Sequence, residues 1–184
     1  DPNHKLMEIP TKSVLNAHSW AGIDWGSGEG SYTVLSIWNY DSAGRFTLIF
    51  AKKYKGMEAD PEFSLSDIIQ LCRKFKVTRI GADWGFGFYA NSRLMKVFTP
   101  RKVVLYQHTG KQKAKVKWDQ EALRWTTHRT RVLQDVFTCI KTGPKSKGIK
   151  FPRWPEMTDF ADDILAVYSE YSEHRGELKF DHRR

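Results

Sequence analysis

One tripeptide, Asp-Trp-Gly, occurs twice in this chain, each time after a short apolar run. Asp24 follows residues 20–23 and Asp83 follows residues 77–82, and both lead into glycine-rich sequence. Short apolar runs bounded by glycine predict buried strands. A carboxylate at the end of a buried strand is costly without a compensating cation. If the two strands are neighbours, Asp24 and Asp83 repel each other and the pKa of one rises, unless a metal ion lies between them.

Paired carboxylates of this kind suit the hydrolysis of a phosphodiester. Two divalent ions about 3.5–4 Å apart activate a water, stabilise the charge on the phosphate and assist the leaving oxygen. Mg²⁺ prefers oxygen ligands and keeps several waters, so a few Asp residues suffice. We therefore expect Asp24 and Asp83 to be catalytic, with Asp24 bridging two Mg²⁺ or Mn²⁺ ions and Asp83 binding one of them. The alternative for either residue alone is a strand-end Asp that caps a turn or a helix.

The net charge of +9 comes from one part of the chain. Between Arg101 and Arg153, 14 Lys and Arg stand against three acidic residues, so this segment carries +11 and the remainder −2. A localised basic segment predicts a polyanionic partner, here double-stranded DNA. Because Lys alternates strictly over residues 111–117, an extended arm would present these side chains on one face. The residues expected to contact phosphates are Lys111, Lys113, Lys115, Lys117, Arg124, Arg129 and Arg131; the alternative is a solvated face.

The chain of 184 residues has the length of one domain, which we expect over residues 19–184 after a lead-in segment at residues 1–18. No stretch is long and apolar enough to span a membrane, and none resembles a signal peptide. None of the six histidines has the spacing of a zinc site. These features favour a non-secreted protein without a membrane partner.

The hydrophobic periods predict three strands joined by short turns, then strands that alternate with helices. Expected strands cover residues 20–24, 32–40, 46–54, 77–83 and 101–106, with a short one at 178–180. Expected helices cover residues 60–75, 89–98, 119–140 and 158–173. This is the order of a ribonuclease-H-like α/β fold, a mixed sheet of three antiparallel and then parallel strands flanked by helices. By analogy with that fold, the first and fourth strands are adjacent, so Asp24 lies beside Asp83.

These motifs resemble the C-terminal nuclease domain of the large terminase subunit, the DNA-packaging protein of tailed bacteriophages. Residues 22–26 look like its first metal-binding strand, residues 80–87 like its second acidic motif, and residues 148–153 like the segment before its last helix. The resemblance covers nearly the whole chain. It implies a divalent-metal-dependent endonuclease that cleaves double-stranded DNA with little sequence specificity and cuts concatemeric viral DNA during packaging.

The same resemblance implies the protein's partners and location. The expected partners are the small terminase subunit, the portal protein and an N-terminal ATPase domain, and the expected location is the host cytoplasm. A phosphate-binding loop of the G-x-x-x-x-G-K-S/T type, which the ATPase domain carries, is absent from this sequence.

The third acidic residue of the family has two possible positions. Asp163, in the pair Asp162-Asp163, is one, although the solvated side of a helix explains both carboxylates equally well. The other position, which we favour, aligns residues 180–182 with the family's strand and His, so that the domain is truncated just before the third acid. His182 is then a neighbour or ligand of the metal site.

Two other functions fit the same residues. One is a Holliday-junction resolvase or recombinase of the same fold, and the other is a non-catalytic, basic DNA-binding module. Three outcomes distinguish these functions. Cleavage of plasmid DNA indicates the endonuclease, cleavage confined to branched DNA indicates the resolvase, and tight binding without cleavage indicates the binding module.

Overall fold

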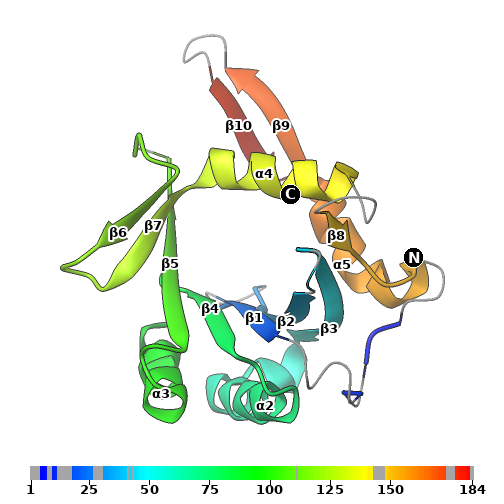
Figure 1. Cartoon of the computed structure of the whole chain (residues 1–184), viewed down its shortest axis with the longest axis vertical. Helices are drawn as coiled ribbons and strands as arrows, with labels where there is room; N and C mark the ends of the chain where they lie inside the picture. Colours follow the sequence, from blue (N-terminus) through cyan, green and yellow to red (C-terminus); the bar gives the residue numbers. More distant parts are fainter. Residues whose placement is uncertain are drawn as a thin grey trace.

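Three antiparallel strands form the first half of the sheet, as the sequence predicts. They are β1 (His18–Asp24), β2 (Thr33–Tyr40) and β3 (Phe46–Tyr54), and each pairs with the next (Figure 1). The structure, a computed structural model, describes residues 5–7, 10–11, 18–26, 31–40, 42, 44–110, 112–142, 148–172 and 177–182, with backbone alone at residues 172, 177–179 and 181–182. Within the predicted lead-in segment, the Met7 amide donates to the Ile49 carbonyl, and β1 already begins at His18.

The second half of the sheet extends from β1 in the parallel sense. β4 (Arg79–Asp83) pairs with β1, β5 (Val103–Thr109) with β4, and β7 (Arg124–His128) with β5. The short strands β6 (Val116–Asp119) and β8 (Ile149–Lys150) close the two edges, which gives the order β6-β7-β5-β4-β1-β2-β3-β8. The predicted neighbourhood of the first and fourth strands is therefore confirmed.

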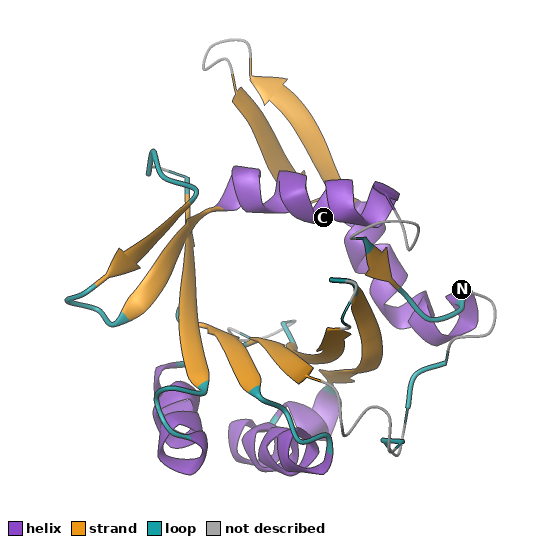
Figure 2. Ribbon diagram, viewed as in Figure 1, coloured by secondary structure: helices purple, strands orange, loops and turns teal. Residues whose placement is uncertain are grey.

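Helices lie on both faces of this sheet (Figure 2). α2 (Pro61–Lys74), which follows a short 3-10 turn (Gly56–Ala59), and α3 (Phe88–Phe98) cover one face. α4 (Arg129–Thr142) and α5 (Trp154–Ala166) lie on the other side, followed by a separate hairpin of β9 (Val167–Ser172) and β10 (Glu177–His182). The side chain of Asp60 accepts a hydrogen bond from the Phe63 amide, so Asp60 is the N-cap of α2, and Pro61 lies in its first turn. No helix in the described ranges is long and apolar enough to cross a membrane.

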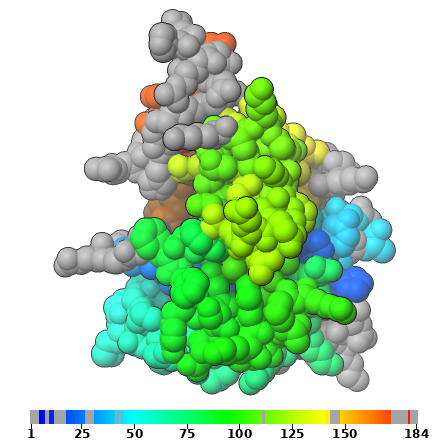
Figure 3. All heavy atoms as spheres, turned by 90° about the vertical axis from the view of Figure 1, so that its left-hand side faces the viewer, coloured from blue at the N-terminus to red at the C-terminus, as the bar shows by residue number. Residues whose placement is uncertain are grey.

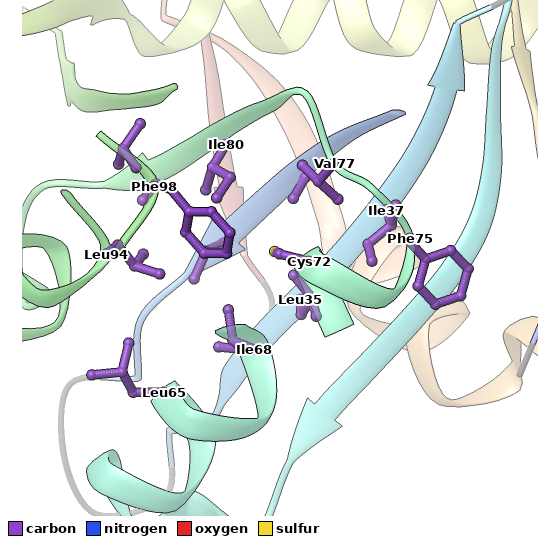
Figure 4. Close-up of a cluster of buried hydrophobic side chains, with 14 of the residues drawn as sticks. Leu35, Ile37, Leu65, Ile68, Cys72, Phe75, Val77, Ile80, Leu94 and Phe98 are labelled. Atoms are coloured by element: carbon purple, nitrogen blue, oxygen red, sulfur yellow. The ribbon is translucent and has the colours of Figure 1, made fainter. Parts of the chain in front are cut away.

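The core lies between the sheet and α2 with α3. Because strand side chains alternate between faces, every second residue of β1, β4 and β5 points toward these helices. Those residues pack against the apolar side of both helices (Figure 4). The strands contribute Ala21, Ile23, Ile80, Ala82, Val103 and Leu105, and the helices contribute Leu65, Ile68, Cys72, Leu94 and Phe98. Burial raises the pKa of the Cys72 thiol to about 12, as expected for an inert core cysteine. The intervening strand residues, Asp24 and Asp83 among them, point to the opposite face.

That opposite face is only loosely covered by α4. The apolar stripe of this helix faces the sheet: Leu133, Val136, Phe137 and Ile140 line a groove of about 530 Å³ whose other wall includes Trp20 and Trp38. No residue of α4, all of which is described, is buried. The face of the sheet that carries the two Asp residues is thus more open than the face against α2.

Two predicted helices are too long in the sequence interpretation. Residues 119–128 are not helical: they contain the turn and second strand of a β6–β7 hairpin, and α4 begins only at Arg129. The run Arg124-Trp125-Thr126-Thr127-His128 is rich in β-branched and aromatic residues, and pairing with β5 selects the strand. In the same way α5 ends at Ala166, because residues 167–172 pair with β10; the short strand predicted at residues 178–180 is confirmed.

We expect Gly87→Ala to destabilise the fold. Gly87 precedes α3 with an ordinary φ of −92°, so its role is close packing: an added Cβ would fall on the indole ring of Trp25, which is 8% exposed. Overpacking of this kind costs about 1–3 kcal/mol. Urea denaturation checks this against Gly110→Ala, where an added Cβ meets nothing within 4 Å. Equal stability of the two variants would contradict the packing described.

Candidate functional site

Asp24 and Asp83 end two adjacent parallel strands on one face of the sheet. Ile23 pairs with Ala82, so the next residue of each strand, which is the Asp, lies beside its counterpart. Asp24 keeps exposed surface and Asp83 is half-buried. Loss of surrounding water raises the pKa of Asp24, the negative charge of Asp83 raises it further, and His108 opposes both. The two carboxylates are therefore close enough for the charge of one to disfavour ionisation of the other.

A buried amide fixes the ends of both strands. Asn91 of α3 is 2% exposed. Its Oδ1 accepts from Trp25 Nε1 at 3.0 Å, and its Nδ2 donates to the Asp83 carbonyl at 2.9 Å. The Asp83 carboxylate itself accepts from the Gly85 amide at 2.8 Å, as in a turn-capping Asp. The capping alternative and a metal-binding role are compatible here, since one backbone bond leaves further carboxylate lone pairs.

His108 belongs to the same group, although the sequence interpretation did not single it out. Asp83 pairs with Tyr106, so His108, two residues further along β5, lies on the face of Asp24 and Asp83. Its Nδ1 is 2.7 Å from Thr127 Oγ1 of β7. Burial lowers the pKa of His108, Asp83 and Asp24 raise it, and Arg129 lowers it. The strand predicted at residues 101–106 ended before His108. A single His outside any motif carries no other sequence signal of a functional role.

The structure brings Arg129 to this group and places the predicted lysines differently. Lys113 and Lys115 lie in a bend and only Lys117 falls in β6, so the lysines do not share one strand face; Lys111 lies outside the described residues. Lys115 forms an ion pair with Asp135 of α4, and Arg131 donates to the Lys113 carbonyl at 2.7 Å. Figure 3 views this side of the molecule, where β5 and the β6–β7 hairpin form much of the green surface.

A correction concerns Arg124, which we expected on the DNA-contacting surface with the lysines. Its guanidinium lies 3.6 Å from the ring centroid of Trp84, and its side chain is only 14% exposed. Because Trp125 pairs with Tyr106, Arg124 and Trp84 occupy the sheet face opposite Asp83. Lys117 pairs with Thr126 and has the same orientation as Arg124. Packing against an aromatic ring therefore accounts for Arg124.

Asp163 approaches the same face from α5. It lies 2.5 Å from Lys53 Nζ and accepts from the Tyr32 hydroxyl at 2.7 Å. Asp24 pairs with Val34 and Val34 with Lys53, so Lys53 is in the row of Asp24, two strands away. At the usual strand spacing, the Cα atoms of Asp24 and Lys53 are about 10 Å apart.

The metal site itself is incomplete in the described part of the chain. No group of three or more His, Cys, Asp and Glu side chains there is close enough to hold a metal ion. The backbone of His182 lies in β10, but its side chain is outside the described residues, so its metal-binding role stays a prediction.

We expect Asp24→Asn to stabilise the metal-free protein at neutral pH. The folded-state pKa of Asp24 lies above its ordinary 3.8, so folding favours the protonated carboxyl. The ionised form thus costs stability, an effect that is absent below the ordinary pKa and complete above the raised one. The melting temperature in EDTA should exceed that of the unmodified chain at pH 7, and the difference should shrink toward about pH 4. The exposed Asp162→Asn is the control; equal behaviour of both variants would contradict the electrostatic coupling.

The architecture matches solved nuclease domains of large terminase subunits. The nuclease of thermophilic phage G20c aligns with a TM-score of 0.55 at 10% identity, over 97% of this chain and 84% of its own. The nuclease domain of gp2 of bacterial virus Sf6 aligns with a TM-score of 0.61 at 10% identity, over 92% and 81%. A mutant of that Sf6 domain, solved with manganese and beta-thujaplicinol, aligns with a TM-score of 0.59 at 10% identity, over 91% and 78%.

No protein-family model and no curated protein matches the chain by sequence. The likeness to the terminase nuclease domains is therefore one of fold. The mixed eight-stranded sheet with helices on both faces is the ribonuclease-H-like fold that those domains share, as the sequence predicted.

Proposed function

We propose that this chain is a divalent-metal-dependent endonuclease that cleaves double-stranded DNA with little sequence specificity. The observation that carries the proposal is the pair Asp24 and Asp83, side by side at the ends of adjacent parallel strands on the open face of the sheet. The fold shared with terminase nuclease domains supports the same reaction. In that setting the enzyme cuts concatemeric viral DNA during genome packaging.

The carboxylate pair suits Mg²⁺ or Mn²⁺ by its donor chemistry. Two carboxylates so close that the charge of Asp83 raises the pKa of Asp24 also attract a divalent cation, which replaces the proton. Asp24 and Asp83, at the ends of the two central strands, are the residues that would hold the ions. The chemistry that such ions would supply is an acidified water and neutralised charge on the phosphate. The chain's own part is to hold both carboxylates in place, through strand pairing and the Asn91 bonds.

Of the two positions for a third acidic ligand, Asp163 now has geometric support. It reaches the row of Asp24 on the correct face, where it forms an ion pair with Lys53. We therefore favour Asp163, which must turn from Lys53 toward Asp24 to complete the site.

The partners follow from the proposed role. Double-stranded DNA is the substrate; the small terminase subunit, the portal protein and an N-terminal ATPase domain are the proposed protein partners, in the host cytoplasm. A non-catalytic DNA-binding module is the second candidate, favoured by the incomplete metal cluster among the described side chains. A junction resolvase or recombinase differs from the first proposal only in substrate.

Supercoiled plasmid incubated with Mg²⁺ or Mn²⁺ tests the proposal. The unmodified chain should nick and then linearise the plasmid, and EDTA should stop it. Asp24→Asn and Asp83→Asn should each reduce the rate by at least about a hundredfold, because each removes a charge that holds an ion. Metal-independent binding without cleavage would establish the binding module instead. Cleavage confined to branched DNA would establish the resolvase.

Asp163→Asn and Asp162→Asn form a matched pair for the third ligand. Asp162 is exposed on α5, whereas Asp163 contacts Lys53 and Tyr32. Asp163→Asn should weaken Mn²⁺ binding, measured by electron paramagnetic resonance, by about tenfold or more and slow cleavage, because one charged ligand is lost. Asp162→Asn should leave both near the unmodified values. Unchanged Mn²⁺ affinity in Asp163→Asn would exclude Asp163 as the third ligand.

A further inference from the structure

The group around His108 combines an imidazole, a buried hydroxyl and a guanidinium beside the two Asp residues. His108 and Thr127 are directly paired across β5 and β7, and their side chains are in contact at 2.7 Å. Thr127 is 4% exposed, so its hydroxyl is held rigidly, whereas His108 is exposed. Arg129 is the first residue of α4, immediately after β7, and is exposed.

The contact with Thr127 fixes which ring nitrogen faces outward. Since Nδ1 meets the Thr127 hydroxyl, Nε2 is the nitrogen directed to a ligand. Thr127 Oγ1 is much nearer to His108 Nδ1 than to the Gln107 carbonyl, 3.5 Å away. A hydroxyl that donates to Nδ1 leaves the proton of a neutral imidazole on Nε2, where it serves as a hydrogen-bond donor. Burial lowers the pKa of His108, which is consistent with a neutral ring.

The charges around His108 favour the binding of an anion there over the binding of a metal ion. Asp83 and Asp24 act on it from one side, and Arg129 acts on it with the opposite sign. A guanidinium beside the ring repels a cation but binds phosphate oxygens well, often through two parallel hydrogen bonds.

We propose that His108 and Arg129 bind a backbone phosphate of the DNA strand next to Asp24 and Asp83, and that Thr127 positions His108. This inference rests on the proposed endonuclease function. It adds two residues that contact the DNA backbone beside the carboxylate pair. Nε2–H of His108 donates to a phosphate oxygen and the Arg129 guanidinium neutralises its charge. The contact orients the strand on the carboxylate pair without reading sequence, as expected of backbone contacts.

DNA binding in EDTA tests the contact without any cleavage. The probe is a fluorescent duplex and the readout is its anisotropy over a range of salt concentrations. Arg129→Ala should weaken binding and reduce the slope of log affinity against log salt by about one, because one phosphate neutralisation is lost. His108→Ala should weaken binding by about two- to tenfold and leave the slope unchanged, because a neutral hydrogen bond is lost.

Thr127 separates positioning from direct contact. Thr127→Val removes the hydroxyl at nearly constant volume and should reproduce the loss seen in His108→Ala, while Thr127→Ser should restore binding. Arg93→Ala, an exposed cation on α3 that bonds Tyr89, controls for general loss of charge and should leave affinity near that of the unmodified chain. Melting temperatures confirm that each variant is folded.

Two results would overturn the inference. One is duplex affinity unchanged in both His108→Ala and Arg129→Ala. The other is loss of Mn²⁺ binding in His108→Ala, measured by electron paramagnetic resonance, since that identifies a metal ligand. A chain that fails to cut plasmid would end the proposed nuclease function, yet the EDTA measurements would still decide whether His108 and Arg129 hold phosphate.

Discussion

The site depends on two negative charges that the fold holds together. Parallel pairing of β1 with β4 ends both strands in Asp, and no backbone rearrangement separates them without breaking the centre of the sheet. Loss of surrounding water and then the neighbouring charge of Asp83 raise the pKa of Asp24. Such a pair costs stability in the absence of a cation, and sites where stability is given up locally are often functional.

Because side chains alternate along each strand, the two faces of the sheet have different roles. One face supplies Ile23, Ala82 and Leu105 to the core against α2 and α3, and this core makes the strand ends rigid. The other face supplies Asp24, Asp83 and His108 to the open side. Asn91 ties the core to the strand ends, because it is buried in α3 and bonds both the Trp25 side chain and the Asp83 carbonyl. Rigid elements of this kind suit two-metal chemistry, in which the protein's task is to fix ligand geometry.

The basic segment has a more varied role than its charge alone indicates. Arg129 lies beside the candidate site, Arg131 and Lys115 brace the hairpin to α4, and Arg124 packs on Trp84. Net charge therefore predicts the kind of partner but not which cations meet it. Orientation on a strand and the nearest acidic or aromatic neighbour decide that for each residue.

The sequence by itself determined the apolar runs, the glycines beside them and the two Asp residues, and these local signals suffice for the order of most elements along the chain. That the two Asp residues lie side by side followed only from the fold analogy, and the pairing of β1 with β4 decided it. It did not determine the β6–β7 hairpin, the end of α5 or the place of His108. Residues 119–128 contain both helix-compatible and strand-compatible residues, and only pairing with β5 selects the strand. His108 and Thr127 are 19 positions apart and meet because β5 and β7 are neighbours, a relation that no local pattern encodes. Tertiary pairing decided these features because the energies of strand pairing and burial exceed the small differences in intrinsic propensity.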